Sequence, residues 1–195
     1  MSRTTTRQTD GPDGGSLGPR SRWVAELLDW GKTLAIAFVV VLLLHFFVFN
    51  LSTVEGSSME PTLEEREWLF VNKIVYFVGH PKRGDIVITK DPEHGIGRKE
   101  YLVKRVIGVP GDTIAVRDGR LYRNGEPVDE PYTNTWIEDP DFAPVEVEPG
   151  TYFVMGDNRR SRASRDSRAF GTVPEDLIRG RADVILWPLD KLNLL

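Results

Sequence analysis

One long apolar run dominates the hydrophobic pattern of this chain. It covers residues 33–49, roughly 17 positions interrupted only by His45, which is close to the minimum length of a membrane-spanning helix. Tryptophans precede the run, aromatic residues occupy its far end, and it has no polar face. The pattern therefore predicts one transmembrane helix over residues 31–50. The alternative is a helix buried in a protein core.

The charges on either side of the run predict its orientation. Basic residues precede it, at Arg20, Arg22 and Lys32, whereas acidic residues dominate the stretch that follows. The positive-inside rule then places the N-terminus in the cytoplasm and the rest of the chain outside the plasma (inner) membrane. No Ala-x-Ala sequence follows the run, so we expect an uncleaved single-pass signal anchor and not a removed signal peptide.

Residues 1–30, ahead of this anchor, are predicted to form a cytoplasmic tail and a juxtamembrane segment. Residues 1–19 are rich in Thr, Gly, Pro, Asp and Arg and lack apolar periodicity, which predicts disorder. Residues 23–30 begin and end with tryptophan and are typical of a short amphipathic approach to a membrane.

Beyond the apolar run the pattern changes to short β-branched and aromatic segments bounded by Gly, Pro, Asp and Asn. Asp118-Gly119 and Asn124-Gly125 indicate hairpin turns, because both dipeptides tolerate positive φ. A single helical turn is expected after Pro174. We therefore predict a mainly β, extracytoplasmic domain over residues 51–195, with a small inserted hairpin region at about 112–150. Strands are expected at residues 68–71, 85–89, 101–107, 113–117, 151–155 and 182–187.

Composition narrows the chemistry available to this domain. The net charge of −4 gives no sign of nucleic-acid binding. The absence of cysteine excludes disulfides, thiol nucleophiles and thiolate metal sites. None of the three histidines lies in a context that suggests a general base, so a Ser-His-Asp triad is not expected. No zinc-protease or phosphate-loop motif is present, and we expect no metal or other cofactor.

Lys104 is the candidate base. In an extended strand it shares a face with Leu102 and Val106, so it points where apolar residues point. Burial lowers the pKa of a lysine from about 10.4 by several units, which lets a neutral amine activate a serine. The alternative is a lysine whose amine extends from a strand edge into solvent.

Three segments in fixed order carry a family resemblance: Gly-Ser-Ser-Met-Glu-Pro-Thr-Leu at 56–63, Lys-Arg-Val-Ile-Gly-Val-Pro-Gly-Asp at 104–112, and Gly-Asp-Asn-Arg at 156–159 followed by Ser-Arg-Asp-Ser-Arg at 164–168. They resemble the motifs of type I signal peptidases, the bacterial leader peptidases that use a Ser-Lys dyad. The resemblance extends from the apolar run to Trp187 and includes Arg-Gly-Asp-Ile-Val at 83–87. It implies an all-β catalytic domain akin to that of the soluble Ser-Lys autoproteases linked to DNA-damage repressors.

The resemblance implies a role for individual residues. Ser58 corresponds to the nucleophile, with Ser57 as its rival by proximity, and Lys104 corresponds to the base. Because Gly56 stands where some members carry a serine, the backbone N–H of Ser58 is the expected oxyanion donor. Supporting roles are implied for Ser164, Asp166, Arg168, Asp157 and Arg105.

Within this supporting set, the resemblance implies that the Ser164 hydroxyl hydrogen-bonds the lysine and that the Asp166 and Arg168 charges brace the site. Asp157 is a plausible partner of Arg105. The gap before Ser164 is longer than in typical members, which leaves Ser161 as the alternative.

The resemblance also implies the substrate and the partners. The family binds its peptide as an added β-strand, and small pockets select small residues, typically alanine, at the first and third positions before the cut. The expected partners are signal peptides of secreted preproteins, membrane lipid and, as a candidate, the export translocon. The residues expected to contact the peptide are Gly56, Ser57, Met59, Leu102 and Val103.

Two further groups of residues have alternative interpretations. Five arginines near the third motif are expected in a solvated loop with one or two ion pairs; the alternative is contact with anionic lipid. These are Arg159, Arg160, Arg162, Arg165 and Arg168. Five aromatic residues are expected in the core in preference to a membrane-dipping surface: Trp68, Phe70, Phe77, Trp136 and Phe142.

The leading hypothesis is a membrane-bound serine endopeptidase that removes signal peptides from exported preproteins. One alternative is a Ser-Lys protease that matures a narrow set of substrates. Another is an inactive membrane-anchored domain that binds extended peptides, which only the longer gap before Ser164 favours.

Overall fold

The computed structural model of the protein describes residues 19–93, 95 and 99–195. The predicted disordered tail falls almost entirely outside this range. The chain divides into two compact units, the first ending at Leu42 and the second comprising Leu43–Leu195. Each unit has its own architecture.

The first unit contains one long helix, α1 (Pro19–Leu43). The juxtamembrane segment and the first part of the apolar run therefore form a single continuous helix. Its apolar side chains near the C-terminal end are all exposed: Leu34, Ile36, Phe38, Val39, Val40, Val41, Leu42 and Leu43. Within the described ranges, no helix is both long enough and apolar enough to cross a membrane.

The bounds of this helix differ from the predicted 31–50. The α-helix ends at Leu43, and Leu44–Val48 form a π-helical turn, η1. Strand β1 (Phe49–Thr53) follows directly. Its backbone pairs with β2 in an antiparallel ladder from Phe49 to Thr53. The apolar run thus supplies a helix, a turn and the first residue of a strand.

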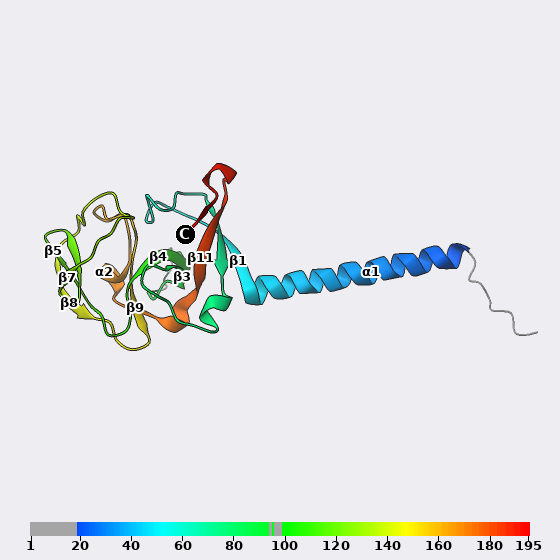
Figure 1. The fold of residues 1–195 in the computed structure, drawn as a ribbon, viewed down its shortest axis with the longest axis horizontal. Coiled ribbons are helices and arrows are strands. Elements are labelled where there is room, and N and C mark those ends of the chain that lie inside the picture. The colour runs from blue at the N-terminus through cyan, green and yellow to red at the C-terminus, as the bar shows by residue number, and fades with distance from the viewer. Residues whose placement is uncertain (1–18, 94, 96–98) are drawn as a thin grey trace, which may run out of the picture. The chain divides into compact units, whose positions relative to one another are not determined.

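The second unit is mainly β, as predicted, and its described strands form two antiparallel sheets (Figure 1). The larger sheet has the order β1-β2-β11-β3-β4-β9-β10, with β12 paired to β11. Its further strands are β2 (Trp68–Asn72), β3 (Ile86–Lys90), β4 (Tyr101–Gly108), β9 (Thr151–Met155), β10 (Val173–Pro174), β11 (Ile178–Trp187) and β12 (Asn193–Leu194). The smaller sheet, β7-β6-β5-β8, comprises β5 (Thr113–Arg117), β6 (Arg120–Arg123), β7 (Glu126–Pro127) and β8 (Phe142–Glu146).

Short helical turns connect several strands of this unit. They are η2 (Ile74–Tyr76), α2 (Ser167–Phe170), η3 (Glu175–Leu177) and η4 (Leu189–Lys191). The turn η3 follows Pro174, where a helical turn was predicted. All four strands of the smaller sheet lie between residues 112 and 150, the region expected to hold an inserted hairpin.

The two predicted hairpin turns have the backbone that their sequences favour. Asp118 and Gly119 have φ of 49° and 70°, and Asn124 and Gly125 have φ of 54° and 84°. Positive φ at both central residues gives a turn whose twist matches that of the flanking strands. These turns join β5 to β6 and β6 to β7.

Strand β4 is central to the arrangement of the site. Along Tyr101–Arg105 it pairs with β3, and from Arg105 to Gly108 it also pairs with β9. One apolar cluster beside it contains Val54, Met59 and Leu63, which follow β1, together with side chains from β2, β3 and β11. This cluster fixes the segment after β1 against the sheet that carries β4.

The expectation that the five aromatic residues are buried is wrong for three of them. Trp68, Phe77 and Trp136 are 49%, 73% and 64% exposed, whereas Phe70 and Phe142 are half-buried. Trp136 lies outside the core because its ring packs on the guanidinium of Arg120, 4.7 Å from the ring centre. Trp68 stands at the start of β2, opposite Trp187 of β11.

Candidate active site

Ser58 lies in the loop that follows β1, and this loop is anchored on both sides of the serine. Met59 and Leu63 are 1% and 0% exposed and pack in the apolar cluster next to β4. The carbonyl of Ser58 accepts the backbone N–H of Asn158 at 3.1 Å. The Asn158 side chain donates to the carbonyl of Ser57 at 3.0 Å. The first and third motifs are therefore joined through their backbones.

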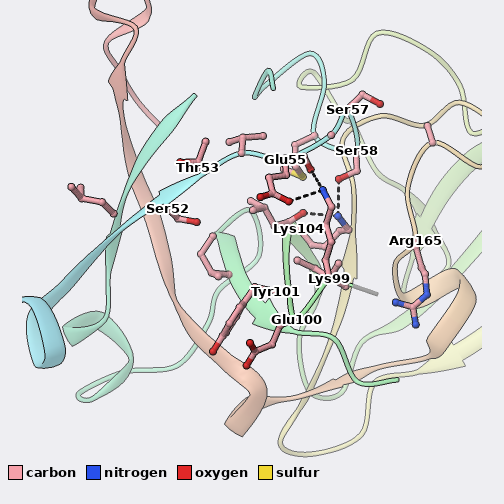
Figure 2. Close-up of a pocket in the computed structure, with 18 residues that line it drawn as sticks. Ser52, Thr53, Glu55, Ser57, Ser58, Lys99, Glu100, Tyr101, Lys104 and Arg165 are labelled. Atoms are coloured by element: carbon pink, nitrogen blue, oxygen red, sulfur yellow. Dashed lines mark hydrogen bonds and ion pairs between the residues drawn. The ribbon is translucent and has the colours of Figure 1, made fainter. Parts of the chain in front are cut away.

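Lys104 lies in β4 with its side chain buried, 2% exposed. Its amine donates to Ser58 Oγ at 2.8 Å and to the Val103 carbonyl at 2.7 Å. Figure 2 shows this amine pointing at the Ser58 hydroxyl. The alternative of an amine that extends into solvent is therefore wrong.

The surroundings of Lys104 favour a neutral amine. Desolvation by burial lowers the pKa of Lys104 to about 8, against the attraction of Asp166 and Asp157, which raises it. The positive charges of Lys99 and Arg168 lower it further. A buried lysine amine loses its hydration, which disfavours its charged ammonium form. Burial is therefore the dominant cause of the lowered pKa. A substantial fraction of the amine is then neutral near pH 8, and its lone pair can accept the Ser58 proton.

Asp166 is the centre of a buried hydrogen-bond network beside this pair. Its Oδ2 accepts from the Gly156 N–H at 3.0 Å, the Ser164 hydroxyl at 2.7 Å and Arg168 Nη2 at 2.7 Å. Although burial alone raises the pKa of a carboxyl group, the hydrogen bonds and charge of Arg168 hold the pKa of Asp166 below its ordinary value. Asp166 therefore carries a negative charge close to the Lys104 amine.

Ser164 lies in the site but has a different partner from the one expected. Its hydroxyl donates to Asp166 and not to Lys104, because the fully buried carboxylate lies within 2.7 Å of it. A side chain at Gly156 would place its Cβ 2.4 Å from Ser164 Oγ and 2.3 Å from the Ser58 carbonyl. Gly156 thus lets these two serines pack closely. The alternative, Ser161, is exposed and faces Asp139.

The longer gap before Ser164 is accommodated at the surface. Arg160, Ser161 and Arg162 are exposed, and Arg162 has a positive φ of 59° that closes the turn. The additional residues therefore bulge outward while Ser164 remains next to Gly156. The feature that favoured an inactive domain leaves the site geometry intact.

Arg105 and Asp157 form the ion pair that the sequence suggested. Arg105 Nη2 and Nε lie 2.7 and 2.9 Å from the two carboxylate oxygens of the fully buried Asp157. Thr62, from the serine loop, donates to the same carboxylate at 2.6 Å. The Arg105 guanidinium also stacks 4.1 Å from the ring centre of Tyr132. This pair ties the serine loop, β4 and the segment after β9 together.

The arginines near the third motif are less solvated than expected. Arg159 is fully buried and pairs with Glu130 at 2.7 Å. Arg165 pairs with Asp91 and Glu93, and Arg168 pairs with Asp139 as well as with Asp166. Arg160 and Arg162 are exposed. Sequence reasoning missed the pairs of these arginines with Glu130, Asp91, Glu93 and Asp139 because those acidic partners are distant along the chain.

A groove of about 610 Å³ runs past Ser58 (Figure 2). One wall consists of residues 51–59 and the other of residues 99–104, and the predicted peptide-contacting residues all lie in these walls. In the described sheet β1 is an edge strand, and residues 101–104 of β4 pair with β3 alone. Backbone from both walls is therefore available to an added strand. Among the described residues, no cluster of side chains suited to a metal ion is present.

Sequence reasoning did not identify Lys99 or its contact with Glu55, a residue expected only as part of the segment that flanks the peptide. The Lys99 amine donates to the Glu55 carbonyl at 2.9 Å and lies 3.2 Å from its carboxylate. Both residues belong to charged surface stretches, and nothing in the local pattern distinguishes them from solvated side chains.

The sequence of this chain is similar to those of known proteins. Residues 27–187 match the family model described as signal peptidase, peptidase S26. Signal peptidase I T of Bacillus subtilis is 44% identical over 85% of this chain and 88% of the relative. Probable signal peptidase I-2 of Synechocystis is 35% identical over 99% of this chain and 84% of the relative. A crystal structure of a signal peptidase I from Enterococcus faecalis is 34% identical, covers 53% of this chain and 97% of its own, and has a TM-score of 0.44. The chain belongs to the signal peptidase family of peptidases, peptidase S26.

Proposed function

We propose that this protein is a membrane-bound serine endopeptidase that cleaves signal peptides from exported preproteins with Ser58 as nucleophile and Lys104 as general base. Its family relationship supports signal-peptide cleavage by a serine peptidase. The observation that carries the assignment of the dyad is the 2.8 Å contact between the buried Lys104 amine and Ser58 Oγ.

The proposed reaction moves one proton through Lys104 in each half. The neutral amine accepts the Ser58 hydroxyl proton as Oγ attacks the carbonyl carbon before the scissile bond. The resulting ammonium donates that proton to the departing amine, which leaves an acyl ester on Ser58. Water then attacks the ester carbon while Lys104 takes its proton, the bond from the carbon to Ser58 Oγ breaks, Lys104 returns the proton to Oγ, and the free carboxyl product is released. The backbone N–H of Ser58 is the expected donor to the oxyanion.

The charges around Lys104 suit both protonation states. Desolvation favours the neutral base, whereas Asp166 and Asp157 stabilise the ammonium that forms during the reaction. Each carboxylate is in turn held by an arginine, Arg168 or Arg105, so neither needs to move when the amine gains its proton. Such fixed charges stabilise a developing charge without reorganisation.

The groove supports binding of the substrate as an added strand. An extended peptide between residues 51–57 and 101–104 can pair with backbone on both sides. Its side chains alternate, so the first and third residues before the cut face the same way. Val54 and Met59 line the groove and would face those two side chains, which we expect to be small, such as alanine.

We infer that the apolar residues between 31 and 48, which precede β1, anchor the enzyme, with the N-terminus in the cytoplasm and the peptidase unit outside. The apolar run, the basic residues before it and the exposure of the apolar side chains at the end of α1 support this inference. Lipid and the export translocon would then be its neighbours. An anchor keeps the peptidase unit beside the membrane, where signal peptides emerge.

Loss of either dyad residue should abolish cleavage. Ser58→Ala and Lys104→Met, assayed on a preprotein with an alanine-x-alanine junction, should each lower kcat on the order of 10³-fold or more. Both variants should stay folded by circular dichroism, because methionine replaces a buried neutral amine of similar volume. Ser57→Ala should retain most of the activity. Cleavage by Ser58→Ala at the wild-type rate would remove Ser58 from the mechanism.

Removal of the Ser164 hydroxyl should weaken catalysis without abolishing it. Ser164→Ala deletes one of the donors to Asp166, whose charge acts on Lys104. We expect kcat/KM to fall by about three- to ten-fold, in line with one hydrogen bond. Ser161→Ala, at an exposed position, is the matched control and should leave the rate unchanged. Equal rates for Ser164→Ala and wild type would show that this hydroxyl has no catalytic influence.

The anchor can be tested by extraction of membranes with alkaline carbonate, which releases peripheral proteins. The full-length chain should remain in the membrane pellet. Val40→Arg places a cation in the middle of the apolar run, at a cost of about 2.5–3.5 kcal/mol to insertion, and should shift protein to the soluble fraction. Release of the wild-type chain by carbonate would contradict the anchor.

A further inference from the structure

The contact between Lys99 and Glu55 spans the groove next to the dyad. Glu55 follows β1 in one wall, and Lys99 precedes β4 in the other. The Lys99 amine is held by two contacts, at 2.9 Å to the Glu55 carbonyl and 3.2 Å to its carboxylate. Figure 2 shows both side chains close to Ser58 and Lys104. A peptide strand that enters the groove must therefore meet this pair.

The Lys99 amine faces the reaction centre. A Cβ at Gly56 would lie 3.7 Å from it, which places the amine against the backbone two residues before Ser58. The positive charges of Lys99 and Arg168 lower the pKa of Lys104, whereas the negative charges of Asp166 and Asp157 raise it. Glu55 is not among the charges with a major effect on this pKa. The Glu55 side chain is more exposed to solvent than that of Lys99, 70% against 51%.

The alternation of an extended peptide determines which substrate residue meets Lys99. In the proposed binding mode the first and third residues before the cut lie over Val54 and Met59, which line the groove. Because the side chains of an extended peptide alternate, the second residue faces away from them, and we place it beside Glu55 and Lys99, which line the same groove and are largely exposed. Its side chain is therefore the one that this cation can contact.

We propose that Lys99 determines specificity by favouring an acidic side chain at the second position before the scissile bond. This proposal rests on the proposed peptidase function. A substrate carboxylate replaces that of Glu55, while the bond from Lys99 to the Glu55 carbonyl keeps the amine in the groove. The exchange is easy because an exposed ion pair contributes little stability. A basic side chain at the same position is repelled by Lys99.

The test compares three peptide substrates that differ only at this position, with alanine-glutamate-alanine, alanine-glutamine-alanine or alanine-lysine-alanine before the cut. The full-length enzyme in detergent micelles should cleave the glutamate peptide with a kcat/KM about two- to five-fold above that of the lysine peptide, as expected for one exposed ion pair. In Lys99→Met the ratio should fall to near one. In Lys99→Glu it should invert.

Glu55→Gln is the matched control. It removes the competing carboxylate but keeps the backbone carbonyl that holds Lys99, so the preference for glutamate should increase. Each ratio is taken within one enzyme variant, so that any change in the pKa of Lys104 affects both peptides equally and cancels. The preference should also decrease at high salt, because the charges are exposed.

Two results would overturn the proposal. One is an equal ratio in wild type and Lys99→Met. The other is an equal rise for all three peptides in Lys99→Met, which would make Lys99 a barrier to the groove with no selectivity. If the wild-type enzyme cleaves none of the three peptides, the proposed peptidase function fails, and with it this proposal. Cleavage of all three at the same rate refutes only the role of Lys99.

Discussion

The hydrogen bond between a buried lysine amine and a serine hydroxyl is the contact on which the rest of this site depends. An amine at its ordinary pKa of about 10.4 is almost wholly charged at neutral pH and cannot accept a proton. Burial of Lys104 in β4 changes this, because the protein disfavours an ammonium that has lost its water. The fold must therefore keep this amine dry and still hold Ser58 within 2.8 Å of it.

The buried ion pairs around the dyad satisfy both requirements. Asp157 with Arg105 and Asp166 with Arg168 are charge pairs with further hydrogen bonds to Thr62, Ser164 and the backbone. Buried charges are tolerated when they are paired and fully hydrogen-bonded, and breaking such a pair is strongly destabilising. These pairs also join the serine loop to β4 and to the segment after β9. The same contacts that stabilise the site thus fix its geometry.

Contacts between residues of the motifs were easier to predict from the sequence than the strands around them. The contact between Ser58 and Lys104 and the ion pair between Arg105 and Asp157 follow from short motifs that the sequence displays. Strands β2, β3, β4, β5, β9 and β11 follow from β-branched runs, whereas β1 begins at the last residue of the apolar run, and β8 contains a proline that argues against a strand.

Contacts between distant parts of the chain were harder to predict. The partner of Ser164 depends on which of two nearby groups lies closer, and the burial of Arg159 depends on Glu130, which lies in another part of the fold. No local sequence pattern indicates the position of Lys99 at the groove.

The claim that Lys104 is a base with a lowered pKa is tested most directly by titration of its amine in the full-length protein. NMR with ¹³Cε-labelled lysine follows the titration, and the signal of Lys104 is assigned by its absence from Lys104→Met. We predict a midpoint near pH 8, so that about a tenth of the amine is neutral at pH 7 and most of it above pH 8. A midpoint at or above about 10, as for a lysine in water, would leave roughly one amine in a thousand or fewer neutral at pH 7 and would contradict its role as the base.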